Sequence, residues 1–497
     1  MTTAPAASGL TTAAVRAIAA LGNVQSGRAD QIADRLAEAI RLGLLAPGER
    51  LPAEAVLSDQ LGVATLTLRE ALAILRDRGL VVTRRGRAGG SFVARPSSGA
   101  LSRSGLASLT VRQLRELGDR RQAVLGTSAA LAARRAARLE IAALRRRVDR
   151  LASATTPGER RRADSEFGIE VAAAAQAPRL TQGEANLRAE LGDLVWVLLS
   201  DDEHAEAVAT RQALVDAVAD GQPDRARQLA EQHIAHETEL LMQWRIDLYR
   251  SEGEHLASAD RIWSALADDV ERILAALRAT AAEYQASVTG SADDYTLADL
   301  AALRPRIHAT LAEFSDLAVG TGIVTAPGVV ADAPYWLEWW WRQVDGTPEA
   351  LRVNLDPSGP DFFDYTTEEW FDVPIRGRRE HVAGPYVDYA CTNQYTYTLS
   401  VPVYDGDRPL GIAAMDVLSD NVERRIMPAL CAGPAPLALL NASGRVIAAS
   451  RAEPAPGAQL ARRRGRAVAR SAALARLCDL TGWTLVTLPR ATRQRPD

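Results

Sequence analysis

The chain has 497 residues, enough for about three domains of ordinary size. Charged residues make up 24% of it and apolar residues 47%, which is typical of a folded globular protein and excludes a disordered or fibrous one. The formal net charge of −4 excludes a chain that is a polycation throughout, as a whole-length partner of nucleic acid or of an anionic membrane would be.

Cysteine usage and the N-terminal sequence indicate a cytoplasmic protein. Cys391, Cys431 and Cys478 lie far apart and form no C-x-x-C pair, which excludes a disulfide scaffold and a zinc finger. The stretch from Met1 to Leu21 lacks a basic first segment and is interrupted by Arg16, so it is not a signal peptide. No uncharged run is long and apolar enough to cross a membrane, and no membrane partner is expected.

The first folded segment shows the pattern of a winged helix-turn-helix. We expect residues 1–25 to be a flexible tail and residues 26–97 to form three short helices and a β-hairpin. Apolar residues at helical spacing mark the helices, and Pro52 and Gly62 bracket the second of them. A glycine-rich tip over residues 84–90 separates the two predicted strands.

Local charge sets this segment apart from the rest of the chain. From Arg78 to Arg103 there are six arginines and no acidic residue. A basic wing beside a helix that enters the major groove would suit DNA, because arginines neutralise phosphates. A solvated, arginine-rich hairpin in a purely structural domain would show the same charge, so charge alone leaves both alternatives open.

The order of short motifs in this segment favours the DNA-binding alternative. Residues 41–54 read RLGLLAPGERLPAE, and Leu-Gly-Val, Leu-Arg-Glu-Ala-Leu, Gly-Leu-Val and Arg-Gly-Arg-Ala-Gly-Gly motifs follow in that order. This series resembles the GntR superfamily of bacterial transcription regulators. The resemblance implies a homodimer in which each protomer places its third helix in the major groove of double-stranded DNA and its wing near the minor groove.

Two places depart from the family pattern. Ala55 follows Leu-Pro-x-Glu where the family usually has arginine, and residues 64–67 read Ala-Thr-Leu-Thr in place of Ser/Thr-Arg-x-Thr. Loss of an arginine that reads guanine removes about 1–3 kcal/mol of base discrimination, so an unusual operator is expected. The resemblance assigns DNA contacts to the third helix and the wing, at Thr65, Thr67, Arg69, Arg84, Arg85, Arg87 and Gly89.

A second, almost wholly helical segment follows. Residues 98–107 have the composition of a linker, and residues 108–247 show helical periodicity with breaks at Thr155–Gly158 and Gly221–Pro223. The helical segment resembles the FCD effector domain that follows the winged helix in one GntR branch.

The metal-binding members of that branch carry an aspartate and three histidines, and this chain matches only part of the set. Asp164 and His233 match, but Gly168 and Arg211 stand where the other two histidines are expected, and His236 would compensate only partly. Two ligands beside an arginine cannot hold a transition metal tightly, so we expect no metal here. A structural or dimerising bundle and a pocket for an organic anion beside Arg211 both stay open.

The remainder of the chain is rich in aromatic residues. Seven of the ten tyrosines lie between Tyr335 and Tyr404, two long helices are predicted over 255–318, and strands dominate from 320 onward. Residues 255–490 resemble the Cache (PAS-like) sensor superfamily, with a reduced second lobe near the C-terminus. The expected fold class is therefore multidomain, with a winged helix-turn-helix, an all-α bundle and an α+β sensor domain.

The tryptophan run over residues 339–341 indicates a ligand wall on the predicted sheet. Successive side chains on a strand point to opposite faces, so Trp340 faces away from its two neighbours, and one face is expected to line a pocket. The alternative is that these tryptophans simply fill the core.

Amino-acid-sensing Cache domains are similar to this chain at four aromatic or acidic positions, and in them an arginine two residues before a tryptophan grips the ligand carboxylate. Glu368 stands at the arginine position and Phe363 where a tyrosine is common. An ammonium group would be attracted where a carboxylate is repelled, and its contact with an aromatic ring would contribute about 0.5–2 kcal/mol. We expect a cationic amine ahead of an amino acid; a different metabolite, with Glu368 in solvent, is the alternative. The ligand-binding prediction comprises Trp340, Glu368, Trp370, Phe371, Tyr386, Asp388 and Asp416.

Three functions compete on this reading. A ligand-responsive transcription regulator accounts for all three segments, and a signalling or scaffold protein whose winged helix no longer reads DNA is the alternative. An enzyme would need chemistry that the sequence does not offer, since it has no phosphate loop, no G-x-S-x-G and no H-E-x-x-H. Neither catalysis nor a cofactor is expected.

Overall fold

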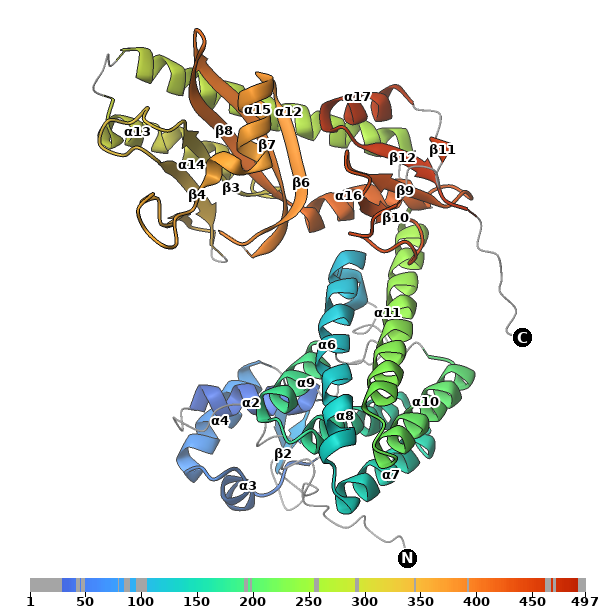
Figure 1. Cartoon of the computed structure of the whole chain (residues 1–497). Helices are drawn as coiled ribbons and strands as arrows, with labels where there is room; N and C mark the ends of the chain where they lie inside the picture. The colour runs from blue at the N-terminus through green and yellow to red at the C-terminus, as the bar shows by residue number, and fades with distance from the viewer. Residues whose placement is uncertain are drawn as a thin grey trace, which may run out of the picture. The chain divides into compact units, whose positions relative to one another are not determined.

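The computed structural model divides the chain into two compact units, whose elements are labelled in Figure 1. The first unit holds Met1–Leu109 and Gln113–Arg245, and the second holds Thr110–Arg112 and Ile246–Asp497. The predicted tail, residues 1–25, lies outside the described part of the chain. The described residues are 29–41, 45, 50–78, 80–84, 90–94, 105–191, 195–196, 199–253, 259–290, 295–343, 346–390, 393–460, 466–467 and 471–489.

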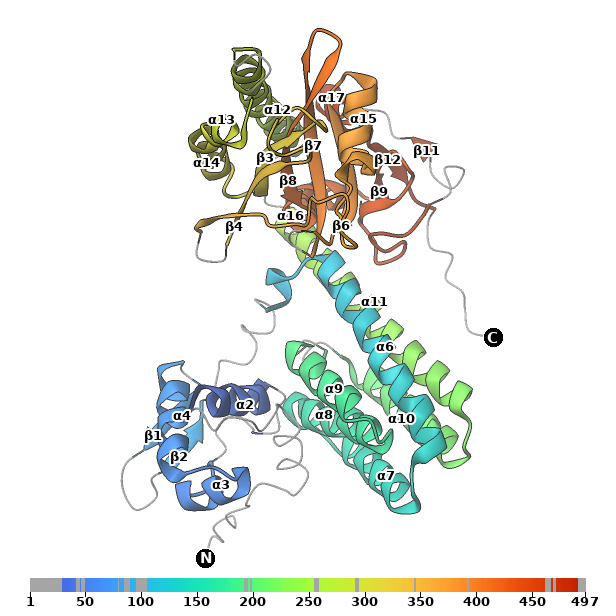
Figure 2. The same ribbon diagram turned by 60° about the vertical axis from the view of Figure 1, so that its left-hand side comes forward.

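The first unit begins with the predicted winged helix-turn-helix (Figure 2). Leu36, Leu68 and Leu72 are buried together in its core, which explains the apolar spacing of the helices. Gly62 ends the second helix with φ of +67°, a left-handed conformation that suits glycine. The elements are α2 (Ala29–Arg41), α3 (Glu54–Leu61), α4 (Thr65–Asp77) and an antiparallel hairpin of β1 (Val81–Arg84) and β2 (Gly90–Val93).

Six helices continue the chain. Thr156 and Ser200 begin two of them with capping boxes, in which the side chain of each accepts a backbone N–H and a glutamate three residues later reaches back. The helices are α6 (Val111–Arg135), α7 (Arg138–Ala152), α8 (Pro157–Ala174), α9 (Pro178–Leu191), α10 (Asp201–Ala219) and α11 (Pro223–Gly253). The breaks predicted near residues 155 and 221 separate α7 from α8 and α10 from α11.

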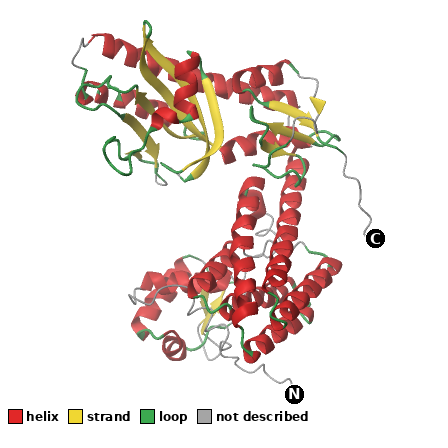
Figure 3. Cartoon of the chain, in the orientation of Figure 1, coloured by secondary structure: helices red, strands yellow, loops and turns green. Residues whose placement is uncertain are grey.

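The second unit has an α+β architecture built on a six-stranded antiparallel sheet (Figure 3). The strand order β5-β4-β3-β8-β7-β6 places β8 and β7 next to each other near one side of the sheet. The strands are β3 (Ala318–Thr325), β4 (Leu337–Arg342), β5 (Pro348–Ala350), β6 (His381–Asp388), β7 (Gln394–Asp405) and β8 (Arg408–Leu418).

Helices cover both faces of this sheet. The 32-residue helix α12 (Ala259–Gly290) packs against β7 and β8, and α15 (Glu369–Gly377) packs on β6, β7 and β8 from the other side. Of the two long helices predicted before the sheet, the first is present as α12, but the second is wrong, because two short helices stand in its place, α13 (Leu297–Ala301) and α14 (Arg304–Glu313). Pro305 explains the second start, since proline fits the first turn of a helix but not its interior.

A smaller lobe completes the unit. It follows α16 (Ser419–Cys431), which begins directly where β8 ends. Its four-stranded antiparallel sheet has the order β10-β9-β12-β11, with α17 between the last two strands in sequence. These elements are β9 (Leu437–Leu440), β10 (Val446–Ala449), β11 (Arg466–Ala467), α17 (Ala472–Thr481) and β12 (Thr484–Thr487). None of the helices described is long and apolar enough to span a bilayer.

Candidate DNA-binding and ligand-binding sites

Helix α4 buries one face and exposes the side chains that sequence analysis assigned to DNA. Leu68, Leu72 and their neighbours point into the core, whereas Arg69 is exposed and Thr65 and Thr67 are half-buried. Sequence analysis did not assign a contact to Leu66, whose side chain is 68% exposed in the first turn. An apolar side chain at this place can contact a thymine methyl group in a major groove. Its signal in the sequence is an apolar residue between two threonines.

Arg69 is held by an acidic residue of the preceding helix. Its Nε donates to Glu54 Oε2 at 2.6 Å, and the two side chains keep 64% and 41% of their surface exposed. Exposed pairs of this kind contribute little to stability, so the arginine can exchange this partner for another acceptor at small cost.

The wing is described only in part. Strands β1 and β2 are paired from Val81 opposite Val93 to Arg84 opposite Gly90. The side chain of Arg84, and the whole of Arg85, Arg87 and Gly89, lie outside the described residues. Their assignment to DNA stays a prediction.

The helical bundle buries a network of charged side chains around Asp164 of α8. Asp164 Oδ2 accepts from Arg188 NH1 at 2.5 Å, and Asp164 Oδ1 accepts from Arg211 NH2 at 2.5 Å. Trp196 Nε1 also donates to Oδ2, at 3.2 Å. Glu237 Oε2 forms an ion pair with the guanidinium group of Arg121 at 2.8 Å, and Glu237 Oε1 forms one with that of Arg211 at 3.3 Å. The three arginines, Trp196 and the two carboxylates are all buried.

Arginine charge governs the ionisation of these carboxylates. Burial by itself would raise the pKa of Asp164, but the guanidinium groups of Arg188 and Arg211 outweigh it and hold the pKa below the ordinary value. Glu237 likewise has its pKa held well below the usual range, against the effect of burial, by His233 and Arg121. Burial lowers the pKa of His233, which favours its neutral form.

This network does not fit the metal site of the FCD resemblance. Both oxygens of Asp164 accept hydrogen bonds from guanidinium groups, which occupy the directions a cation would need. Gly168 faces Arg188, and a Cβ on that glycine would lie 2.4 Å from Arg188 Nε. Among the residues that the structure describes, no three of His, Cys, Asp and Glu are grouped so as to hold a metal ion.

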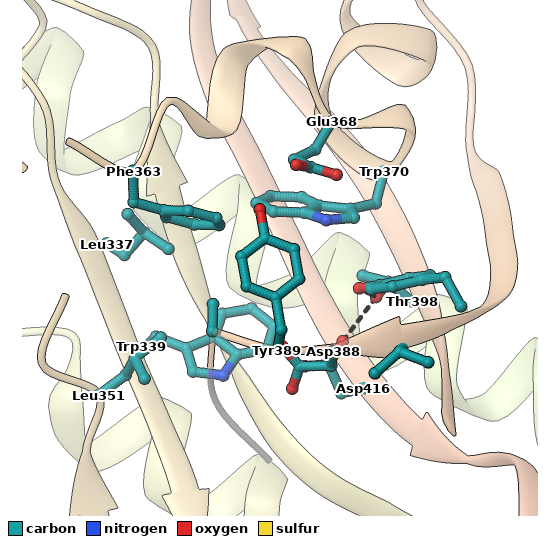
Figure 4. A pocket seen from close by; sticks show the side chains of 13 residues that line it. Leu337, Trp339, Leu351, Phe363, Glu368, Trp370, Asp388, Tyr389, Thr398 and Asp416 are labelled. Carbon is teal, nitrogen blue, oxygen red and sulfur yellow. Dashed lines mark hydrogen bonds between the residues drawn. The ribbon is translucent and has the colours of Figure 1, made fainter. Parts of the chain in front are cut away.

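The second unit contains a cavity of about 50 Å³ on the face of the sheet that carries α15 (Figure 4). Its walls come from β4, β6, β7, β8 and the segment leading into α15. Three carboxylates and five aromatic rings contribute to it, and none of the lining residues is basic. The lining residues are Leu337, Trp339, Leu351, Phe363, Glu368, Trp370, Tyr386, Val387, Asp388, Tyr389, Ala390, Thr398 and Asp416.

Two of the predicted ligand residues lie elsewhere. Trp339, rather than Trp340, lines the cavity; Trp340 points to the opposite face, where its Nε1 donates to Glu338 at 2.8 Å and its ring meets His308. Gly322 pairs with Trp339 and Thr321 with Trp340, so the pleat of β4 decides which indole faces the cavity. Phe371 is also absent from the walls, because its ring packs against Tyr365 at 5.2 Å between centroids.

The other five predicted residues come together at the cavity. Thr398 Oγ1 donates to Asp416 Oδ1 at 2.6 Å and therefore accepts its second bond, also at 2.6 Å, from the hydroxyl of Tyr386. Glu368 lies beside Trp370 at the opposite rim, and Asp388 lies near Asp416 (Figure 4).

Burial makes Asp416 and Glu368 hard to ionise. Desolvation, strengthened by the charge of Asp388, raises the pKa of Asp416 to about 8. Desolvation also raises the pKa of Glu368, with a further contribution from Asp364. A cation bound in the cavity would favour the ionised form of both carboxyl groups.

Comparisons with known proteins place the first unit in two known families. Residues 28–93 match the family of bacterial regulatory proteins of the gntR type, and residues 116–236 match the FCD domain. A protein of Mycobacterium gastri named as an HTH-type transcriptional regulator, RmpR, is 42% identical over 212 residues, which cover 42% of this chain and 77% of that protein.

The chain belongs to the GntR family. Among solved structures, Escherichia coli McbR/YncC is 20% identical with a TM-score of 0.28, and the match covers 43% of this chain and 96% of that one. For the second unit, the ligand-binding domain of the Campylobacter jejuni chemoreceptor Tlp3 is 15% identical with a TM-score of 0.28, over 41% of this chain and 71% of its own. This GntR chain therefore combines a winged helix and an FCD region with a further unit of α+β architecture.

Proposed function

We propose that this GntR-family chain is a cytoplasmic transcription regulator that binds operator DNA as a homodimer and senses a small organic cation in the cavity of its second unit. The observation that carries the ligand class is the composition of the cavity. Glu368, Asp388 and Asp416 converge on it, and none of its thirteen lining residues is basic. A ligand carboxylate would face three acids and no counter-charge.

Aromatic rings give the same cavity affinity for an ammonium group. Trp370 and Tyr386 lie beside the carboxylates, and a cation over such a ring gains about 0.5–2 kcal/mol. The buried indole N–H of Trp339 has no hydrogen-bond partner among the described residues, so it offers a donor to a hydroxyl of the ligand. The volume of about 50 Å³ suits a head group of a few heavy atoms rather than a large metabolite.

The FCD region serves as a structural or dimerising bundle in this proposal. Arg188 and Arg211 neutralise Asp164 without any added ion, so the region needs neither metal nor effector to satisfy its buried charges. Sensing is then a property of the second unit.

Two measurements test the proposal. Electrophoretic mobility shift with DNA from upstream of the protein's own gene should give a complex that the Arg69/Arg85/Arg87 triple alanine variant weakens, and equal affinity of both proteins for every duplex would contradict DNA binding. Thermal shift against amines, amino acids and organic acids should give stabilisation by amines, since a ligand that binds the folded state raises the melting temperature. Stabilisation by carboxylic acids alone, unaffected by Asp416→Ala, would contradict the ligand class.

A further inference from the structure

The start of helix α6 is held by two buried carboxylates of α16. Glu423 Oε1 accepts from the backbone N–H of Val111 at 2.6 Å, and Glu423 Oε2 accepts from that of Arg112 at 3.0 Å. Asp420 Oδ1 accepts from Thr110 Oγ1 at 2.9 Å and from the Arg112 guanidinium at 2.6 and 2.8 Å. These residues all belong to the second unit. We call the contacts of Asp420 and Glu423 with residues 110–112 the α6 clasp.

The α6 clasp is buried and specific. Thr110 and Glu423 are 0% and 1% exposed, and Arg112 and Asp420 are 8% and 7% exposed. The first backbone N–H groups of a helix have no partner within it, and here a carboxylate from a helix more than 300 residues away satisfies two of them. Removing either carboxylate would leave buried donors unpaired, which costs far more than losing an exposed contact.

Two of the strands that line the cavity, β7 and β8, also carry or adjoin residues that contact the α6 clasp. Strand β8 carries Asp416 in the cavity, ends at Leu418 and passes without a loop into α16, so Asp420 is four residues away. Strand β7 carries Thr398, the hydrogen-bonded partner of Asp416. Three residues earlier, at about 10 Å along the strand, the Tyr395 ring lies 5.7 Å from the guanidinium carbon of Arg112.

Helix α6 continues this connection through the chain itself. It runs unbroken from Val111 to Arg135, so its first two residues belong to the second unit and the rest of it to the first. The gntR match ends at residue 93, before α6 begins, and the FCD match begins at residue 116, within α6. A displacement of the start of α6 therefore acts on a helix whose remaining residues belong to the first unit.

We propose that the α6 clasp transmits the state of the sensor cavity to α6, and that the effector regulates operator binding through Asp420 and Glu423. This inference rests on the proposed sensor function. A ligand that binds Asp416 changes the hydrogen bond between Thr398 and Asp416 and displaces their side chains. A close-packed interior transmits such a displacement to the neighbouring element. The clasp then favours one of two arrangements of the first turn of α6, which is the two-state element that regulation needs.

Hydrogen exchange on the full chain tests the link without requiring an operator or a known effector. The cavity is perturbed by Asp416→Leu, by Thr398→Val, and in the wild type by ethylamine, ethanolamine or choline. Amide exchange in the peptide containing Val111 and Arg112 is then followed by mass spectrometry. We expect a change of about fivefold or more in that peptide, the lower range of allosteric coupling. Unchanged exchange there in both variants would overturn the inference.

The clasp itself is tested by Asp420→Asn together with Glu423→Gln, with Asp420→Asn alone as the milder variant. The exposed Arg424 on the same helix supplies the matched control, Arg424→Ala. An amine that alters operator affinity in the wild type should still bind the clasp variants but leave their operator affinity unchanged, whereas Arg424→Ala should respond as the wild type does. A full response in the clasp variants would contradict the inference.

Failure of the proposed function gives a different result. If none of the three amines raises the melting temperature, the ligand class fails, and the two cavity variants alone decide whether the clasp responds. If an amine stabilises the protein but leaves exchange at Val111 and Arg112 unchanged, the sensor stands and the clasp does not transmit its state.

Discussion

Gly168 and Arg188 share one space in the helical bundle: the guanidinium group of Arg188 lies where a side chain on Gly168 would have to go. A Cβ built on Gly168 would approach Arg188 Nε to 2.4 Å and its NH2 to 2.4 Å. Arg188 reaches that place because Asp164 and Glu184 both bind it, at 2.5 and 2.6 Å. The glycine that stands where metal-binding FCD domains have a histidine is thus the one that admits the arginine.

Gly168→Ala should therefore destabilise the chain. Alanine is ordinarily better than glycine inside a helix by about 1 kcal/mol, but here overpacking against buried Arg188 should cost about 1–3 kcal/mol. Thermal unfolding measures the difference. Gly158→Ala, in the same helix and with nothing within 4 Å of the added Cβ, is the matched control and should be neutral or stabilising. Equal melting temperatures for the two variants would show that Arg188 moves away from the added methyl group without a cost in stability.

Metal analysis of protein purified without chelators should give far less than one transition metal per chain. Asp164 and His233 are the two matching ligands, and the guanidinium groups already satisfy Asp164. Elemental analysis by mass spectrometry makes the measurement. A stoichiometric metal that disappears in both Asp164→Ala and His233→Ala would contradict the assignment of this region as a structural bundle.

Amine affinity should depend on Glu368 and not on its neighbour. Glu368 lines the cavity, whereas Glu369 is exposed and pairs with His381 at 3.0 Å. Glu368→Gln should weaken amine binding about tenfold, since removing a charge that faces a bound cation costs 1.4 kcal/mol or more, while Glu369→Gln should bind as the wild type does. Calorimetric titration of both variants with the stabilising amine decides the point. An equal loss of amine affinity in the two variants would show that the bound cation does not face Glu368.

Binding of the amine should strengthen with pH. The pKa of Asp416 stands at about 8 because of burial, and a bound ammonium requires the ionised form. Below pH 8 affinity should fall by up to about tenfold per pH unit, and Asp416→Asn should remove this dependence along with most of the affinity. Titrations between pH 6 and 9 measure it. A flat profile for the wild type would show that Asp416 does not face the cation.

The same pKa gives the sign of a stability effect in the ligand-free protein. Between the ordinary carboxyl pKa and about 8, the folded state holds the Asp416 proton and the unfolded state does not. Stability contributed by this group therefore falls as pH rises through that window. Asp416→Asn cannot ionise, so its melting temperature relative to the wild type should rise by several degrees between pH 6 and pH 9. No relative rise would mean that water reaches the carboxyl group.

On the DNA side, Arg69→Ala should lower operator affinity by about 1–3 kcal/mol with little effect on random duplexes. Replacement of Arg85 and Arg87 should weaken all duplexes and reduce the salt slope by about 2, because phosphate contacts carry no sequence information. Arg76→Ala, in the last turn of the helix that carries Arg69, is the control variant. Salt-dependent binding isotherms separate the two classes, and an Arg69→Ala effect that is equal on every duplex would reassign Arg69 to the backbone.

The three helices and the hairpin of the winged helix could be predicted because local signals set them. Apolar spacing defined α2 and α4, and Gly62 closes α3 in the conformation that a glycine permits. In the sheet, alternation predicted that neighbouring tryptophans face opposite ways, but the choice of Trp339 over Trp340 depends on how β4 pairs with β3. A shift of one residue exchanges the two faces, and no property of the tryptophan run itself settles it.

Contacts between distant segments were beyond sequence reasoning. Arg188 lies on another helix from Asp164, at no spacing that periodicity detects, so its place beside Gly168 follows only from the packing of α8 on α9. Nothing in the local sequence marks Asp420 and Glu423 as buried, yet both are buried against residues more than 300 positions earlier. Their burial is decided by the fold of the whole second unit.

The ion pair between Arg69 and Glu54 has a consequence for how the regulator searches a genome. Any duplex that engages Arg69 must first displace Glu54, and this penalty is the same for every sequence. Because this penalty does not depend on sequence, it lowers the affinity of every complex that uses Arg69 by the same factor. Glu54 therefore sets the strength of binding in the proposed regulator and leaves the ranking of its sites unchanged.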